Sequence, residues 1–314
     1  MSIAGLFPGQ GSQSPGMLAN LAVPFPLVTD TFQEASDALG RNLWTLAQEG
    51  TEAELNATEN TQPLMLAAGV ACYRVWLQQG GALPKAVAGH SLGEYSALVA
   101  AGVLEFADAV TLVAERARLM QHAVPEGAGA MAAILGLDDD KVVAACAEAA
   151  GDEVVEAVNF NSPGQVVIAG TVAAVERAIA AATQAGAKKA ISLPVSVPSH
   201  CALMKPAAEQ LQAQLISTPF LEARMPVLHN VDAQAREEAD DIRAALAQQL
   251  YRPVRWVETV QCLLNDYQAA VLLEFGPGKV LTGLNRRIER RMKAAPVFDQ
   301  ASLEAALKLC EEEG

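Results

Sequence analysis

Short apolar runs alternate with amphipathic stretches along most of the chain. Residues 2–7 form an apolar run that stops at Pro8-Gly9-Gln10-Gly11, and a second run, residues 85–89, leads directly into a helical stretch over 92–101. Residues 106–120 place their apolar side chains at helical spacing. Strands linked by crossover helices predict an α/β fold with a mainly parallel sheet flanked by helices, in which ligands bind at the carboxyl ends of the strands.

The stretch 127–196 follows a different order of elements. Its pattern predicts the order βαββαβ, with strands over 129–135, 154–161, 165–170 and 187–194 and helices over 138–150 and 172–185. This ferredoxin-like order builds an antiparallel sheet with two helices on one face. We therefore expect an inserted ferredoxin-like subdomain over 127–196, and a large α/β catalytic domain made of residues 1–126 and 197–314.

Beyond the insertion the chain returns to helices over 205–216 and 237–249 and a strand over 270–275, followed by a basic helix within residues 279–293. This basic segment carries six basic residues and one acidic residue, in a chain whose net charge is −14. It is either the solvated face of a helix or a docking patch for an acidic partner. The acidic balance of the whole chain argues against a nucleic-acid-binding or anionic-membrane-binding surface.

Composition narrows the class of protein further. Of 314 residues, 51% are hydrophobic and 18% are charged, which excludes a disordered chain. The five cysteines are widely spaced and never form a CxxC pair, so neither a disulfide framework nor a zinc ribbon is expected, and no metal site is predicted. The sequence has no transmembrane-length apolar run and no signal-peptide pattern. We expect a cytoplasmic protein.

The pentapeptide Gly89-His90-Ser91-Leu92-Gly93 matches G-x-S-x-G and lies between a predicted strand and a predicted helix. Two glycines allow a sharp turn that exposes the Ser91 hydroxyl at the strand end. The helix N-terminus behind the serine offers free N–H groups to a developing oxyanion. The alternative is a turn serine without chemistry.

A nucleophilic serine needs a base, and histidine is the usual one. The chain has four histidines. His90 adjoins the serine, and His122 and His229 lie at the ends of predicted elements. His200 remains as the candidate base, because two prolines stiffen the loop before it. A loop histidine without a catalytic role is the alternative.

Three further positions are candidates for binding the substrate. The Leu92 N–H and the Gln10 N–H, from the glycine-rich turn after the first strand, could together form an oxyanion hole. That turn is neither a Walker A loop nor a complete G-x-G-x-x-G motif, so nucleotide binding is not favoured. Arg116 borders the apolar stripe of its helix. It either forms a structural ion pair with a carboxylate or clamps a substrate carboxylate.

Together these pieces resemble the bacterial malonyl-CoA:acyl carrier protein transacylase family of type II fatty acid synthesis. The matching stretches span nearly the whole chain, at residues 7–13, 89–98, 195–200, 249–254 and 274–278. The family also has an α/β-hydrolase-like core with an inserted ferredoxin-like subdomain. The resemblance implies an acyltransferase that moves malonyl from malonyl-CoA to the phosphopantetheine thiol of acyl carrier protein by a ping-pong reaction, without a cofactor.

The resemblance also implies roles for single residues. Ser91 matches the acylated nucleophile and His200 its base. Gln10 and Leu92 match the backbone oxyanion donors, and Arg116 matches the clamp on the malonyl carboxylate. Gln249 matches the position whose backbone carbonyl orients the catalytic histidine, in place of an acidic residue. Arg118 and the acidic tail 311–313 match no motif.

Two other functions stay open on the residues alone. G-x-S-x-G by itself also fits a hydrolase of the α/β type, and the basic segment also fits a carrier-binding module without turnover. The resemblance leaves open the pathway (fatty acid, polyketide or malonate metabolism) and the discrimination between malonyl and methylmalonyl. It also leaves the oligomeric state open, with a monomer as the working expectation.

Overall fold

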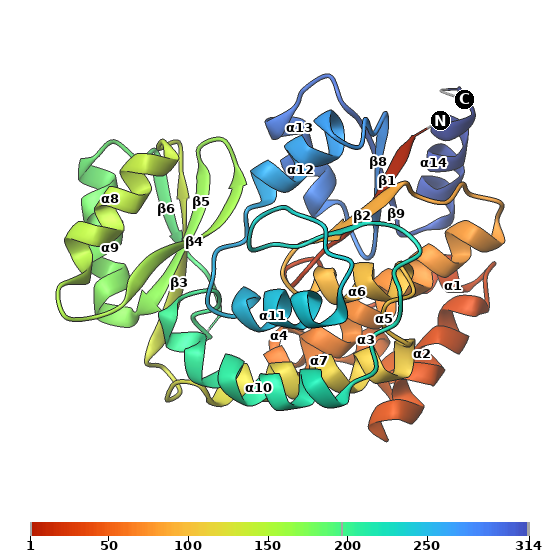
Figure 1. Cartoon of the computed structure of the whole chain (residues 1–314), viewed down its shortest axis with the longest axis horizontal. Helices are drawn as coiled ribbons and strands as arrows, with labels where there is room; N and C mark the ends of the chain where they lie inside the picture. Colours follow the sequence, from red (N-terminus) through yellow and green to blue (C-terminus); the bar gives the residue numbers. More distant parts are fainter. Residues whose placement is uncertain (1, 196, 313–314) are drawn as a thin grey trace.

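The computed structural model describes residues 2–195 and 197–312 and contains a five-stranded sheet at its centre (Figure 1). The strand order is β7-β2-β1-β8-β9, and every pair of neighbours is parallel. The strands are β1 (Ile3–Phe7), β2 (Ala86–Gly89), β7 (Val227–Leu228), β8 (Val271–Phe275) and β9 (Lys293–Val297). The α/β class with a parallel sheet flanked by helices is therefore confirmed.

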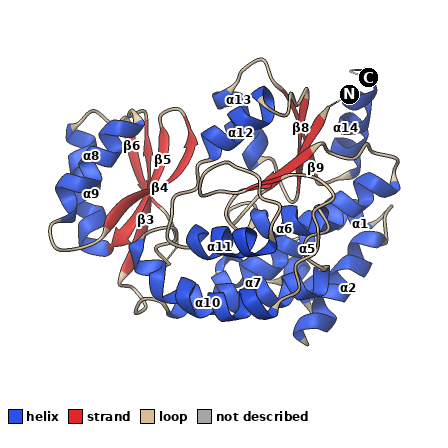
Figure 2. Cartoon of the chain, viewed as in Figure 1, coloured by secondary structure: helices blue, strands red, loops and turns tan. Residues whose placement is uncertain are grey.

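Both faces of this sheet are buried, because the side chains of each strand alternate between two apolar clusters. Ile3 and Phe7 pack into the larger cluster, whereas Ala4 and Leu6 pack into the smaller one. The smaller cluster is closed by α12 (Trp256–Asn265) and α13 (Val280–Ile288). The remaining helices of the large part contribute to the other cluster (Figure 2): α1 (Ala19–Ala22), α2 (Leu27–Leu39), α3 (Leu43–Glu49), α4 (Glu52–Asn56), α5 (Thr58–Gln78), α6 (Gly93–Ala100), α7 (Phe106–His122), α10 (Lys205–Ser217), α11 (Ala239–Gln249) and α14 (Gln300–Glu312).

A second, antiparallel sheet has the strand order β4-β5-β3-β6. Its strands β3 (Gly129–Leu135), β4 (Val155–Ser162), β5 (Gln165–Thr171) and β6 (Lys189–Ser192) are joined in βαββαβ order by α8 (Asp139–Ala150) and α9 (Val172–Gln184). These two helices share a separate apolar cluster with one face of the sheet. On this support we propose residues 127–196 as an inserted subdomain. Its last residue, Ser196, lies outside the described residues.

The helix predicted within the basic segment is present, but it covers only part of the segment. Helix α13 ends at Ile288, Glu289 is extended, and Lys293 begins β9. Residues 293–297 form the edge strand β9, whose backbone pairs with β8. The sequence pattern, Lys293 followed by a few apolar residues, did not reveal this pairing. The sequence analysis assigned no bounds to the helices α1 to α4, and of strand β7 it predicted only an element end near His229.

Two further findings concern the described residues as a whole. The five cysteines are free, and three of them, Cys72, Cys146 and Cys201, are buried. No helix within residues 2–195 and 197–312 is long and apolar enough to cross a membrane.

Candidate active site

Ser91 lies at a sharp turn between β2 and α6, with φ at +52°. This left-handed conformation is uncommon for a residue with a Cβ and is typical of strained turns at functional sites. Gly89 and Gly93 must be glycines, because neither position has room for a Cβ atom. A Cβ on Gly89 would overlap the backbone of Gly93, and a Cβ on Gly93 would overlap the carbonyl of Phe7. The motif therefore forms the nucleophile elbow that its sequence predicts.

Three loops meet around this turn because they follow three adjacent parallel strands. Gln10 follows β1, Ser91 follows β2, and Asn230 follows β7. The Asn230 side chain joins two of these loops: its Oδ1 accepts from the Ser91 N–H at 2.7 Å, and its Nδ2 donates to the Gly89 carbonyl at 2.6 Å. The carboxyl end of the sheet is thus the site that the parallel topology predicts.

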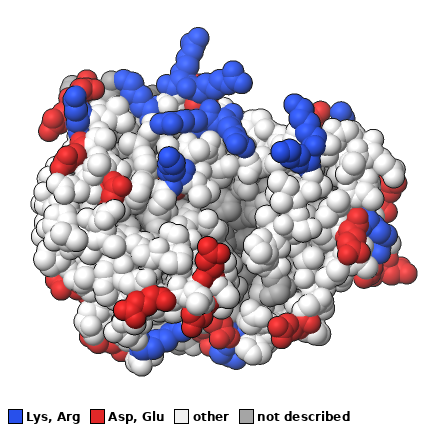
Figure 3. Space-filling model, turned by 180° about the vertical axis from the view of Figure 1, so that it is seen from behind, with Lys and Arg blue, Asp and Glu red and all other residues white. Residues whose placement is uncertain are grey.

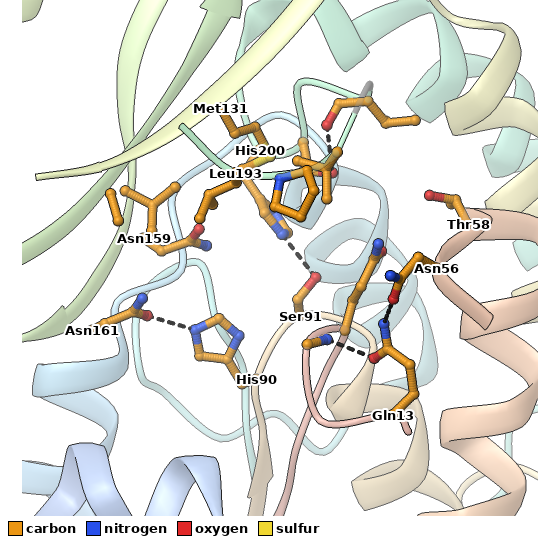
Figure 4. A pocket seen from close by; sticks show the side chains of 18 of the residues that line it. Gln13, Asn56, Thr58, His90, Ser91, Met131, Asn159, Asn161, Leu193 and His200 are labelled. Atoms are coloured by element: carbon orange, nitrogen blue, oxygen red, sulfur yellow. Dashed lines mark hydrogen bonds between the residues drawn. The ribbon is translucent and has the colours of Figure 1, made fainter. Parts of the chain in front are cut away.

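His200 faces the serine, with its Nε2 at 2.8 Å from the Ser91 Oγ (Figure 4). Its Nδ1 lies 2.7 Å from the backbone carbonyl of Gln249. A carbonyl only accepts, so Nδ1 carries the proton and Nε2 presents its lone pair to the serine hydroxyl. The sequence analysis named His200 as the candidate base for Ser91, and the structure places the two side chains in contact.

Burial keeps the imidazole of His200 neutral. The side chain is 2% exposed. Desolvation, followed by the positive charge of Arg116, lowers the pKa of His200 to about 3. A neutral imidazole that accepts from the serine hydroxyl is the form that general-base catalysis requires.

The two backbone donors expected for an oxyanion lie on loops that are firmly held. Within the described chain, neither the Leu92 N–H nor the Gln10 N–H donates to a protein acceptor. The Gln10 loop is braced by Gln13, whose Oε1 accepts from Gly11 N–H at 2.7 Å and whose Nε2 donates to Asn56 at 2.6 Å. Both N–H groups therefore remain available to a ligand.

Arg116 is buried, being 1% exposed, and has an unusual set of partners. Its guanidinium donates to the Oε1 of Gln62 at 2.7 Å and to the Oε1 of Gln249 at 2.9 Å. The ion pair with a carboxylate that would mark a purely structural arginine is not among its contacts in the described chain. Its Nε has no hydrogen-bond partner in that part of the chain. Arg116 thus has no direct ion pair among the described residues, although Glu94 is near enough to interact with its charge. Arg116 does not line the cavity described next.

A cavity of 340 Å³ opens beside the Ser91–His200 pair, which is called the dyad below. Its lining includes Ser91 and His200 together with Met131, Asn159 and Val167 from the antiparallel sheet. Figure 4 shows Ser91, His200, Met131 and Asn159 around this space. The dyad therefore borders a space between the two sheets that can hold a ligand. Among the described residues, no group of three or more His, Cys, Asp or Glu side chains is placed to hold a metal ion.

The other candidates from the sequence have different surroundings. His90 donates from Nε2 to Asn161 at 2.7 Å, His122 contacts the Arg118 carbonyl at the end of α7, and His229 contacts Glu94. Arg118 is exposed and pairs with Glu115 on its own helix. None of these side chains reaches the Ser91 hydroxyl.

Comparisons with known proteins identify the family of this chain. The family model described as the acyl transferase domain matches residues 6–300. The chain belongs to this acyl transferase family. The Escherichia coli K12 malonyl CoA-acyl carrier protein transacylase is 57% identical over 308 residues, which cover 97% of this chain and 98% of that protein. The corresponding Bacillus subtilis transacylase is 44% identical, covering 99% and 98% of the two chains.

Solved structures of other acyl transferases have the same fold as this one. A malonyl-transacylase in complex with a type II polyketide synthase acyl-carrier protein superposes with a TM-score of 0.97 at 56% identity, covering 98% of this chain and 100% of that chain. An acyl carrier protein S-malonyltransferase from Vibrio cholerae superposes with a TM-score of 0.94 at 54% identity, with the same coverage.

Sequence reasoning missed four polar side chains of this acyl transferase site: Gln62, Glu94, Asn161 and Asn230. Glu94 is fully buried and lies one helical turn after Ser91. A charged residue within an otherwise apolar helix start was the available signal for it. Asn230 lies two residues after a short apolar run, at the kind of strand end where the site was expected. Gln62 and Asn161 carried no local signal.

Proposed function

We propose that this acyl transferase is a malonyl-CoA:acyl carrier protein S-malonyltransferase of type II fatty acid synthesis. The observation that carries the proposal is the Ser91–His200 contact of 2.8 Å at a nucleophile elbow, in a chain 57% identical to a malonyl transacylase. The partners are malonyl-CoA and the phosphopantetheine arm of acyl carrier protein, and no nucleic acid, membrane or cofactor takes part. A cytoplasmic location is part of the proposal, and the free cysteines support it.

In the first half-reaction, the Ser91 Oγ attacks the thioester carbonyl of malonyl-CoA while Nε2 of His200 takes the hydroxyl proton. The negative charge that develops on the carbonyl oxygen is stabilised by the N–H groups of Gln10 and Leu92. The carbon–sulfur bond then breaks, and His200 returns its proton to the departing CoA thiolate. A malonyl ester on Ser91 remains.

In the second half-reaction, His200 takes the proton of the phosphopantetheine thiol, and the resulting thiolate attacks the malonyl ester. The same N–H groups stabilise the oxyanion, the bond to the Ser91 oxygen breaks, and the proton returns to that oxygen. The carbonyl of Gln249 keeps the imidazole in the required tautomer in both halves. Acyl transfer between two thiols needs no further proton donor.

We assign the choice of malonyl to Arg116, which would form a paired hydrogen bond with the free carboxylate of the substrate. Its charge is held by two amide oxygens rather than cancelled by a direct carboxylate, which supports this role. Because Arg116 does not line the cavity, the carboxylate must displace one of these glutamine contacts to reach it. An acyl group without a carboxylate would offer no such exchange.

The test is a transfer assay with paired donors. Purified protein is mixed with holo acyl carrier protein and equal concentrations of malonyl-CoA and acetyl-CoA, and the acylated carrier is identified by mass spectrometry. We expect malonyl carrier to dominate and Ser91→Ala to form none. Release of free malonate without carrier acylation would contradict the proposal and favour a hydrolase.

A further inference from the structure

Glu94 is a fully buried carboxylate that the reaction above does not use. Burying a carboxylate costs several kcal/mol unless hydrogen bonds compensate it. Three donors surround this one: Nδ1 of His229 at 2.7 Å, the N–H of Asn230 at 2.9 Å and Nε2 of Gln249 at 2.8 Å. Glu94 thus joins the start of α6, the loop after β7 and the end of α11.

Two of these contacts, those of Asn230 and Gln249, continue to groups that the reaction needs. Asn230, held by its backbone, uses its side chain to fix the Ser91 N–H and the Gly89 carbonyl. Gln249, held by its side-chain amide, uses its backbone carbonyl to orient His200. The same Gln249 amide also donates to the Ser91 carbonyl at 2.9 Å. A single residue therefore connects each member of the dyad to the Glu94 carboxylate: Asn230 connects Ser91, and Gln249 connects His200.

The carboxylate also decides which way the Gln249 amide faces. A carboxylate only accepts, so the NH₂ group of Gln249 must point to Glu94, and its Oε1 must point to Arg116, which only donates. A neutral amide at position 94 could donate as well as accept. That change removes one of the groups that fix the orientation of Gln249, and leaves Arg116 and the Ser91 carbonyl as the others.

We propose that Glu94 is a positioning residue, which holds Ser91 through Asn230 and His200 through Gln249 in the geometry needed for proton transfer. The proposal rests on the proposed function only for the identity of the acyl group. Activation of Ser91 by His200 can be measured with any reagent that acylates or phosphorylates an activated serine. Displacement of a reacting group by about 1 Å costs on the order of 100-fold in rate.

The experiment compares Glu94→Gln with a matched variant, Glu274→Gln. Glu274 is also buried and also accepts three hydrogen bonds, from the Leu281 N–H, the Thr282 N–H and the Thr282 hydroxyl. None of these partners contacts the dyad. Both variants replace a buried carboxylate by an amide, so both lower the melting temperature, but only one disturbs the supports of Ser91 and His200.

The readout is the rate at which a fluorophosphonate labels Ser91, which depends on the dyad and not on malonyl recognition. We expect the rate to fall about 10- to 100-fold in Glu94→Gln and to change by less than about twofold in Glu274→Gln. For malonyl-CoA, kcat should fall in Glu94→Gln without a matching rise in KM. Glu94→Asp, which keeps the charge on a shorter side chain, should recover part of the rate.

A folded Glu94→Gln that labels within about twofold of wild type would overturn the proposal. If Glu94→Gln does not fold, Gln249→Met decides, because it keeps the backbone carbonyl and removes the amide that Glu94 holds. Its labelling should fall about tenfold, and an unchanged rate would overturn the proposal. Failure of the proposed function is a separate outcome, in which wild type is labelled by the fluorophosphonate but transfers no malonyl.

Discussion

The two sheets border the same cavity but contribute different kinds of groups to it. The parallel sheet presents polar reacting groups at its strand ends, with Ser91 held by backbone geometry and by Asn230. The antiparallel sheet presents a wall that includes the apolar Met131, Ala133 and Val167 together with the amides of Asn159, Asn161 and Gln165, none of which contacts the Ser91 hydroxyl. The comparison teaches that the chemistry depends on loops fixed at the carboxyl ends of parallel strands, whereas the second sheet shapes the space beside them.

Among substitutions of the polar groups at the strand ends, His200→Ala should have the largest effect on the acylation rate. Without the imidazole the Ser91 hydroxyl keeps its proton, so the rate of acylation by malonyl-CoA should fall by a factor on the order of 10³ to 10⁴. Rapid-quench measurement of acyl-enzyme formation checks this. His122→Ala, which removes a histidine at the end of α7, is the matched control and should retain the wild-type rate.

The pH profile sharpens the same prediction. Since burial lowers the pKa of His200 to about 3, the imidazole stays neutral throughout the neutral and mildly acidic range. The acylation kcat/KM should stay flat from about pH 8 down to about pH 5. A decline centred near the ordinary histidine pKa of about 6.5 would show that the base is not held as the structure shows.

Arg116→Ala should have the next largest effect. Losing the clamp should lower malonyl kcat/KM by about 10²- to 10³-fold and raise the relative rate with acetyl-CoA. Arg118→Ala, on the same helix but exposed and paired with Glu115, should leave both rates unchanged. An equal loss for both donors in Arg116→Ala would instead indicate a structural arginine.

How far the sequence predicted this site depends on whether the relevant contacts are local. The elbow at Ser91 was predictable because strand, glycines and helix start are contiguous, and the fold class followed from the order of apolar runs. The pairing of Ser91 with His200 spans 109 positions, and it was predicted by elimination among the four histidines and by the resemblance rather than by a local pattern. Glu94 and Gln249 lie 155 positions apart, so no local pattern could reveal their contact. Lys293 was misassigned to a helix because its structure depends on pairing with β8.

Substitutions on the antiparallel side should have smaller effects. Met131→Ala enlarges the cavity and removes apolar contact area without touching the dyad, so KM for malonyl-CoA should rise about three- to tenfold with kcat within about twofold of wild type. Steady-state kinetics separate the two constants. A collapse of kcat equal to that of His200→Ala would show that the wall takes part in the chemistry.

The smallest effect is expected at the basic segment, whose six basic residues are all exposed. Figure 3 shows Lys and Arg side chains gathered along the upper edge of the molecule, where Figure 1 places α13. Reversing Arg290 and Arg291 to Glu should raise KM for the acidic carrier about two- to fivefold at low salt, and less at high salt. Acylation by malonyl-CoA should change less. Identical kinetics at both salt concentrations would assign the segment to an ordinary solvated surface.

The most direct test of the account is the intact mass of the protein after brief incubation with malonyl-CoA, followed by peptide mapping. Wild type should gain a single malonyl group located on Ser91, and Ser91→Ala should gain none. A wild-type protein that stays unmodified, or a Ser91→Ala variant that is still acylated, would contradict the assignment of Ser91 as the nucleophile.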